Sequence, residues 1–318
     1  MTNEMIGAIV LSFAITAVTG PFVIPFLRKL KFGQTEREEG VASHLKKAGT
    51  PTMGGVMFLL AILVTAILFL PGHPGYLPAL VLTMGFGLIG FLDDYLKVVK
   101  KNSDGLLPKQ KLLLQAVVTV VFLLLLIFYT RDDLTLLIPF SGGLYANIGF
   151  LAYPLLFIVV LATVNGVNFT DGLDGLASSV TVVSAAFFAA AALHLETGME
   201  VLPCAVIGGL LGFLLFNCYP ARIFMGDTGS LALGGFVAGM AYMLHMPLFI
   251  LLIGLIYAVE LLSVVLQVTY FKATHGKRIF KMTPIHHHFE LCDWSETRIV
   301  TTFTIITILM GLLSWIAM

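Results

Sequence analysis

Long apolar stretches and short polar segments alternate along the whole chain. About 20 consecutive apolar residues are needed to cross the hydrocarbon core of a bilayer as a helix. The apolar runs are continuous and do not alternate at every second residue, which excludes a β-barrel. The pattern therefore predicts an all-α, polytopic integral membrane protein with residues 1–318 in a single domain. The ten expected transmembrane helices are 5–27, 54–70, 77–95, 112–129, 149–164, 175–194, 200–216, 230–246, 248–270 and 299–317.

Composition supports this fold class. Of the 318 residues, 58% are hydrophobic and only 11% are charged, and the mean hydropathy is +0.98. A soluble domain carries about 25% charged residues, so a globular cytosolic protein and a disordered protein are excluded. The three cysteines form no CxxC pair, which argues against a thiolate metal site or a disulfide framework.

The distribution of basic residues predicts the orientation in the membrane. The odd-numbered loops hold 17 of the 18 Lys and Arg, and only Arg131 falls in an even-numbered loop. The positive-inside rule then places the odd loops in the cytoplasm and both termini outside. The predicted outside connections are short except for 130–148, where residues 134–146 are expected to form a small hairpin.

Carboxylates gather at the predicted cytoplasmic ends of the helices. They are Asp93, Asp94, Asp171, Asp174 and Asp227. Clustered carboxylates near a bilayer repel each other and lose solvation, so they tend to be used with a cation. Mg²⁺ takes one or two carboxylates together with substrate phosphates. The alternative, helix capping, suits Asp171 and Asp227 but not an Asp pair at the end of a helix, where the dipole disfavours negative charge.

Basic and imidazole groups accompany these acids. Lys47 and Thr52 precede a predicted helix start, where free N–H groups bind anions, and Lys97 follows the Asp pair. The lysines after the pair have an alternative role at anionic lipid head groups. Residues 284–290 carry three adjacent histidines, which fit hydrogen bonding or proton transfer beside a phosphate better than zinc binding.

One acid is predicted inside a membrane helix. Glu260 lies within the ninth apolar stretch. An intramembrane acid is a candidate functional residue, because placing a charge there is costly. The alternative is a hydrogen bond that packs one helix against another, and the sequence leaves both roles open.

These motifs resemble those of the phospho-N-acetylmuramoyl-pentapeptide transferases, a branch of the polyprenyl-phosphate N-acetylhexosamine-1-phosphate transferases. The resemblance runs from about residue 28 to the end. The motif at 284–290 points to this branch rather than to the N-acetylglucosamine branch. The departures at Ala48, Phe169 and Cys292 remove no reactive group. The matching segments are 43–55, 93–97, 168–177, 217–230 and 284–290.

The resemblance implies a reaction and its partners. Phospho-MurNAc-pentapeptide would pass from UDP-MurNAc-pentapeptide to undecaprenyl phosphate, giving lipid I and UMP with Mg²⁺ as cofactor. It also implies a multi-pass protein of the bacterial cell membrane with its active site on the cytoplasmic face, a groove for the polyprenyl chain near the ninth span, and a homodimer. No nucleic-acid partner is expected.

The resemblance also assigns roles to individual residues. Asp93 is the candidate to deprotonate the lipid phosphate. Asp227 is the Mg²⁺ ligand, and Asp93 and Asp94 are candidates for further ligands. Phe224 is expected to stack on uracil. The implied catalytic residues are Asp93, Asp94, Asp227 and His286. The implied substrate-binding residues are Lys47, Thr52, Lys97, Asn168, Asp171, Gly172, Leu173, Asp174, Asn217, Phe224, His287 and His288.

Two alternatives stay open at this point. A transferase of the sister branch would use UDP-N-acetylglucosamine or a related sugar nucleotide, and the histidine motif argues against it. A transporter of anionic substrates would need polar residues near the middle of the membrane on several helices. Here the polar residues gather at one face.

Overall fold

The computed structural model describes residues 2–30, 49–98, 100 and 105–318. It confirms the all-α prediction, and each of the ten predicted apolar ranges overlaps one long helix. These helices are α1 (Asn3–Lys29), α2 (Gly55–Phe69), α3 (Leu77–Val98), α4 (Pro108–Leu125), α5 (Ala152–Thr170), α6 (Leu176–His194), α7 (Val201–Asn217), α8 (Gly226–Met243), α10 (Leu255–Ala273) and α12 (Glu296–Ala317).

Short elements join the long helices. A π-helical turn, η3 (Leu126–Thr130), extends α4, and β1 (Leu136–Leu137) pairs antiparallel with β2 (Tyr145–Ala146), which forms the hairpin expected within 134–146. Leu136 pairs with Ala146 and Leu137 with Tyr145. The remaining short elements are η2 (Pro74–Tyr76), η4 (Gly149–Leu151), η5 (Pro247–Phe249), α9 (Ile250–Ile253) and α11 (Ile285–Glu290).

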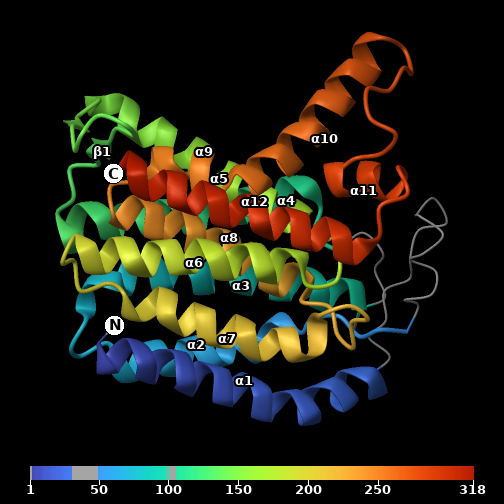
Figure 1. Cartoon of the computed structure of the whole chain (residues 1–318), viewed down its shortest axis with the longest axis horizontal. Helices are drawn as coiled ribbons and strands as arrows, with labels where there is room; N and C mark the ends of the chain where they lie inside the picture. Colours follow the sequence, from blue (N-terminus) through green and yellow to red (C-terminus); the bar gives the residue numbers. More distant parts are fainter. Residues whose placement is uncertain (1, 31–48, 99, 101–104) are drawn as a thin grey trace.

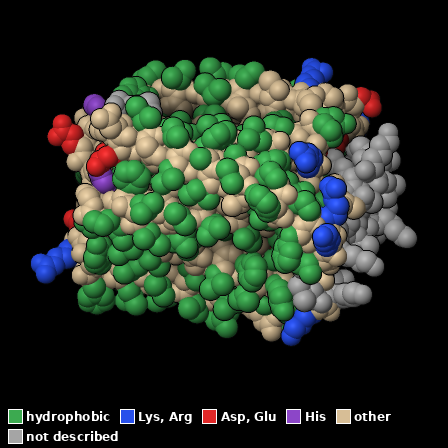
Figure 2. Space-filling model, turned by 90° about the horizontal axis from the view of Figure 1, so that it is seen from below, with side chains coloured by type: hydrophobic (Ala, Val, Ile, Leu, Met, Phe, Trp, Pro, Cys, Tyr) green, Lys and Arg blue, Asp and Glu red, His purple; other side chains and the backbone are tan. Residues whose placement is uncertain are grey.

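The described part of the chain has the character of a multi-pass membrane protein. Seven of its helices are long and apolar enough to cross a bilayer, and α2 and α7 are shorter apolar helices. In the face shown in Figure 2, hydrophobic side chains cover the middle of the molecule, while charged side chains lie at the two ends. The long helices run side by side, whereas α10 leans away from the others, and α11 contacts α10 through His286 and Glu260 (Figure 1).

The helix α8 lies at the centre of the bundle. Its residues from Thr228 to Met243 are all buried, which fits its position against α2, α3 and α5. The backbones of α3 and α8 come close because Gly90 has no side chain: a Cβ there would overlap the backbone carbonyl of Asp227. This close approach determines where the first turn of α8 lies.

The alternating directions of the helices bring the predicted site motifs to one end of the bundle. The helices α3, α5, α7 and α10 finish at this end, and α4, α6, α8 and α12 begin there. We call it the motif end. The hairpin and residues 130–133 lie at the opposite end, because they follow the C-terminal end of α4.

Candidate active site

The first turn of α8 is capped by a carboxylate from α3. Asp94 is 4% exposed. Its Oδ1 accepts a hydrogen bond from the N–H of Asp227 at 3.2 Å, and its Oδ2 accepts from the N–H of Thr228 at 2.9 Å and from the Thr228 hydroxyl at 2.6 Å. The first N–H groups of a helix have no partner within it, and negative charge is favourable there. An acid at the end of α3 is therefore stabilised by the start of α8.

Close packing brings a second segment to this cap. Gly226 has a positive φ of 71°, and a Cβ at this position would lie 2.6 Å from Oδ2 of Asp94 and 2.8 Å from Oγ1 of Thr52. Thr52 belongs to a segment that hydrogen-bonds to the loop before α8, where the N–H of Phe224 donates to the carbonyl of Pro51 at 2.8 Å. Thr52 and Phe224 are thus held beside the start of α8.

Asp93 faces lysines from two helices. It is 1% exposed, and its Oδ1 accepts a hydrogen bond from the N–H of Leu106 at 2.8 Å. Its Oδ2 lies 2.6 Å from Nζ of Lys97, one turn further along α3, and 3.8 Å from Nζ of Lys111 in α4. A buried carboxylate needs such partners, because an unpaired buried charge is very costly.

Asp227 shares the same two lysines. Its Oδ2 lies 2.9 Å from Nζ of Lys111 and 3.1 Å from Nζ of Lys97. Its Oδ1 accepts a hydrogen bond of 2.8 Å from Nδ2 of Asn168 in α5, which also donates to Oγ of Ser230 at 2.8 Å. Four helices therefore meet at one group of side chains. We call it the carboxylate–lysine cluster: Asp93, Lys97, Lys111, Asn168 and Asp227.

The sequence did not predict a site role for Lys111, which lies among the basic residues of the predicted cytoplasmic loops. A signal was present, because Lys111 lies in the first turn of an apolar helix, where the helix dipole disfavours a cation. Its ion pair with Asp227 explains why a lysine occupies that position.

The cluster has the donor chemistry of a Mg²⁺ site. Oδ2 of Asp93 and Oδ2 of Asp227 lie within 3.1 Å of the same ammonium nitrogen, that of Lys97, so the two carboxylates converge. Mg²⁺ prefers carboxylate oxygens, keeps several waters and also binds substrate phosphates. Asp94 fits this role less well, because both of its oxygens accept hydrogen bonds from the start of α8.

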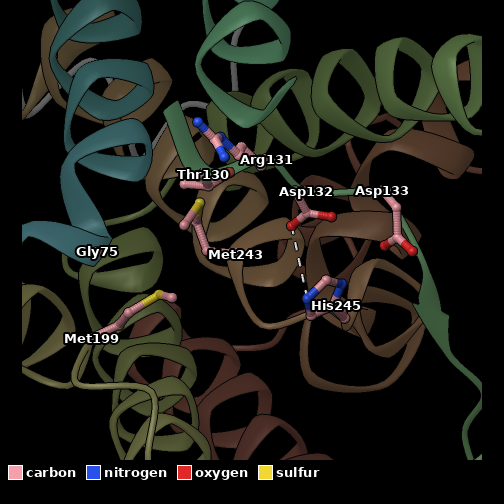
Figure 3. Close-up of a pocket in the computed structure, with 8 residues that line it drawn as sticks. All are labelled: Gly75, Thr130, Arg131, Asp132, Asp133, Met199, Met243 and His245. Carbon is pink, nitrogen blue, oxygen red and sulfur yellow. Dashed lines mark ion pairs between the residues drawn. The ribbon is translucent and has the colours of Figure 1, made fainter. Parts of the chain in front are cut away.

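A second group that could hold a metal lies at the opposite end of the bundle. Ligand atoms of Asp132, Asp133 and His245 lie within 4.8 Å of one another, and Nε2 of His245 is 3.8 Å from Oδ2 of Asp132. Figure 3 shows these residues around a cavity of about 340 Å³. The sequence did not predict this group. It follows the C-terminal ends of α4 and α8, a full helix length from the carboxylate–lysine cluster.

Two predicted nucleotide-binding residues hold the loops of the motif end together. Asn217 is 2% exposed, and its Oδ1 accepts from the N–H of Gly175 at 3.1 Å while its Nδ2 donates to the carbonyl of Ile223 at 3.0 Å. Oδ2 of Asp174 accepts from the N–H of Ala221 at 2.8 Å. These bonds join the 171–175 loop to the 218–225 loop.

Asp171 follows the last residue of α5 and begins the 171–175 loop. Burial raises the pKa of its carboxyl well above the usual range, and the negative charges of Asp227, Asp94 and Asp174 raise it further. Asp171 therefore holds its proton more strongly than an exposed aspartate does.

The three histidines have different surroundings. His286 is fully buried, with Nδ1 3.1 Å from Oε1 of Glu260. His287 pairs with Oε2 of Glu290 at 2.7 Å. His288 accepts from the N–H of Lys281 at 3.2 Å, and its ring packs against two phenylalanines, Phe280 and Phe289.

The structure thus brings some predicted site residues together and separates others. Asp93, Asp227, Lys97 and Asn168 meet in the cluster, and Asp94 and Thr52 lie beside it. His286 lies against the backbone of Gly172, which precedes the buried Leu173. His288 contacts residues between 280 and 292, away from the cluster. Lys47 lies outside the described residues.

Comparison with known proteins identifies a family. A family model described as "Glycosyl transferase family 4" matches residues 76–245, and one described as "Phospho-N-acetylmuramoyl-pentapeptide-transferase signature 1" matches residues 47–59. The chain is similar to three curated proteins named phospho-N-acetylmuramoyl-pentapeptide-transferase. The relative from Clostridium botulinum (strain Alaska E43 / Type E3) is 48% identical, and the match covers 100% of this chain and 98% of the relative. The relative from Acetivibrio thermocellus is 48% identical, with 97% of this chain and 94% of the relative covered. The relative from Clostridioides difficile strain 630 is 47% identical, with 99% of this chain and 98% of the relative covered.

The role of Asp94 as a cap is testable by thermal unfolding in detergent. Asp94→Ala leaves the N–H groups of Asp227 and Thr228 without their acceptor, so it should lower the free energy of unfolding by about 1–3 kcal/mol and reduce Tm. Asp133→Ala removes an exposed acid at the opposite end and should leave Tm nearly unchanged. Equal Tm values for wild type and Asp94→Ala would contradict the capping role.

Proposed function

The chain belongs to the phospho-N-acetylmuramoyl-pentapeptide transferases, and from that premise we propose that it transfers phospho-MurNAc-pentapeptide from UDP-MurNAc-pentapeptide to undecaprenyl phosphate. The products are lipid I and UMP, in the first membrane step of peptidoglycan synthesis. The observation that carries this proposal is the 48% identity with named transferases over the whole chain. The described parts of the motifs that suggested the family from the sequence lie together at one end of the bundle.

The position of the carboxylate–lysine cluster suits these two substrates. The sugar nucleotide is soluble in water, whereas the acceptor phosphate is attached to a lipid. A site that serves both must lie where the membrane meets water. The cluster lies at the end of α3 and at the start of α8, at the motif end of the bundle.

The side chains of the cluster suit phosphoryl transfer. An oxygen of the lipid phosphate attacks the phosphorus bonded to the sugar, the P–O bond to the uridylate breaks, and UMP leaves with the bonding electrons. Such reactions depend mainly on positioning and on neutralising negative charge. Lys97 and Lys111 supply two positive charges, and Asp93 remains our candidate to accept the proton of the lipid phosphate.

We assign Mg²⁺ to Asp227, with Asp93 as a second ligand. The two carboxylates converge on Lys97, and their oxygens are the type that Mg²⁺ prefers. A bound Mg²⁺ supplies charge neutralisation at phosphate oxygens. We assign Asp94 to the positioning of Asp227, through its hydrogen bonds to the first turn of α8.

The loops of the motif end form our proposed nucleotide site. Phe224 is held by its backbone next to Thr52, and its ring is our candidate to stack on uracil. Asn217 and Asp174 support this site through the loops that they join. We place the polyprenyl chain along α10, where Leu262, Val265 and Leu266 present exposed apolar side chains.

We propose that ten helices span the membrane, with both termini outside and the active site on the cytoplasmic face of the bacterial cell membrane. The distribution of Lys and Arg supports this orientation, because Lys97, Lys111 and Lys277 lie at the motif end. The single domain over residues 1–318 and the homodimer stay predictions. Neither of the two alternative functions gains support: the polar cluster lies at a helix end, not at mid-membrane.

Release of UMP tests the function directly. The purified protein in detergent should release UMP from UDP-MurNAc-pentapeptide only when undecaprenyl phosphate and Mg²⁺ are present, and removal of Mg²⁺ by a chelator should stop the reaction. UDP-N-acetylglucosamine should give no release under the same conditions. Release from UDP-N-acetylglucosamine alone would favour the sister branch, and binding without release would favour a transporter.

The location of the metal can be tested with a matched pair of variants. Asp227→Asn should reduce UMP release to less than about a tenth at every Mg²⁺ concentration, because a ligand and its charge are lost. Asp132→Asn removes a carboxylate of the other metal-capable group and should keep near wild-type turnover with an unchanged Mg²⁺ dependence. Loss of activity in Asp132→Asn with activity retained in Asp227→Asn would contradict this assignment and place the metal at the opposite end of the bundle, with Asp132.

The orientation is tested by cysteine accessibility in intact cells. The background lacks Cys204, Cys218 and Cys292. In it, Asp133→Cys should react with an impermeant thiol reagent, because this exposed residue lies in a predicted outside loop. Lys277→Cys is also exposed, but it should react only after the membrane is opened. Labelling in the reverse pattern would invert the proposed orientation.

A further inference from the structure

A fully buried acid and a fully buried histidine form a pair beside the proposed site. Glu260 in α10 and His286 in α11 are both 0% exposed, and Oε1 of Glu260 lies 3.1 Å from Nδ1 of His286. The other atom of each group, Oε2 of Glu260 and Nε2 of His286, has no hydrogen-bond partner among the described residues. Buried polar groups normally have partners, so this pair calls for an explanation.

The neighbouring polar groups do not supply the missing contacts. The Ser263 hydroxyl donates to the backbone carbonyl of Glu260 at 2.7 Å, and not to its carboxylate. The hydroxyl of Tyr257, one turn earlier in α10, lies 2.9 Å from Oγ1 of Thr181. A role in helix packing would use both oxygens of Glu260 against neighbouring helices. Among the described residues, the side chain of Glu260 instead forms a hydrogen bond only with His286.

The free nitrogen of His286 points at the 171–175 loop. A Cβ on Gly172 would overlap Nε2 of His286, so only glycine leaves room for the ring in this position. The loop begins next to Asn168, whose amide donates to Asp227 of the carboxylate–lysine cluster. Nε2 is therefore directed at the backbone of Gly172, close in sequence to Asn168 of the cluster.

The pairing with Glu260 determines which nitrogen of His286 carries the proton. A carboxylate is only an acceptor, so Nδ1 must donate to it, and the neutral ring then has its lone pair on Nε2. The hydrogen bond from Nδ1 to the carboxylate also fixes the orientation of the ring, as carboxylates do for other functional histidines. Without the acid, neither the tautomer nor the direction of Nε2 is specified.

We propose that Glu260 is a positioning residue that holds His286 in the Nδ1–H tautomer, with the lone pair of Nε2 directed at the 171–173 backbone, where it can accept a hydrogen bond from a hydroxyl or N–H group of the sugar nucleotide. The identity of that ligand rests on the proposed function. The orientation of His286 by Glu260 stands on the geometry alone. Glu260 acts through His286 and does not touch the substrate.

Three single variants separate positioning from packing. Glu260→Leu removes the acceptor and should lower kcat for UMP release by about ten-fold or more, with a smaller change in KM for the sugar nucleotide. Glu260→Gln keeps an oxygen that can accept from Nδ1–H, so it should retain several-fold more activity than Glu260→Leu. The control is Glu200→Leu, which removes another buried acid with an unpartnered oxygen at the opposite end, and kcat should not change.

A double-mutant cycle tests whether Glu260 acts through His286. Adding Glu260→Leu to His286→Ala should reduce kcat no further, because the group that Glu260 orients is already absent. A further ten-fold loss in the double variant would assign Glu260 to helix packing and overturn the proposal.

Nitrogen NMR of protein with isotope-labelled histidines reports the tautomer of each ring. The signals of His286 are identified by their absence in His286→Ala. Wild type and Glu260→Gln should show the Nδ1–H form, and Glu260→Leu should shift toward Nε2–H. An unchanged tautomer in Glu260→Leu would overturn the proposal.

The NMR measurement of the tautomer needs no substrate. A wild-type protein that shows the expected tautomers but releases no UMP would contradict the proposed function and leave the Glu260–His286 pairing supported.

Discussion

The capping of α8 by Asp94 is the interaction on which the rest of the site depends. The helix dipole and the unpaired N–H groups at the start of α8 attract a carboxylate, and α3 supplies it from its C-terminal end. The absence of a side chain at Gly90 lets the two backbones approach closely enough for this contact. Once α3 and α8 are joined in this way, Asp227 is placed next to Asp93 and Lys97, and the cluster follows.

Charge balance is the second constraint. The buried carboxylate of Asp93 and the partly exposed carboxylate of Asp227 face two ammonium groups, those of Lys97 and Lys111. Removing one partner would leave an uncompensated charge close to the membrane, which is more costly than the pair is favourable. The same arrangement suits a phosphate ligand. Lysines held between carboxylates can exchange one anionic partner for another without a large change in the local charge.

The two ends of the bundle carry different chemistry. The motif end has the lysines, the carboxylates and the loops joined by Asn217, all of which suit phosphates and a nucleotide. The opposite end has the hairpin, a cavity and the group of Asp132, Asp133 and His245, and among the described residues Arg131 is the one arginine or lysine that lines the cavity. This separation explains why a metal ion assisting phosphoryl transfer is assigned to Asp227, although both ends contain carboxylates.

The sequence by itself determined the helices, their order and the end at which each motif lies. Hydrophobic stretches specify helices locally, and the alternating direction of successive helices then places residues 93–97, 168–175 and 224–230 at one end without knowledge of packing. Packing between distant helices decided the roles of individual side chains. Through packing, Asp94 caps the start of α8 and Lys111 forms an ion pair with Asp227. Asn217 forms a hydrogen bond with the N–H of Gly175, and His288 accepts a hydrogen bond from the N–H of Lys281. These contacts join residues from 7 to more than 130 positions apart, and hydrophobic periodicity carries no information about which helix a polar side chain will meet.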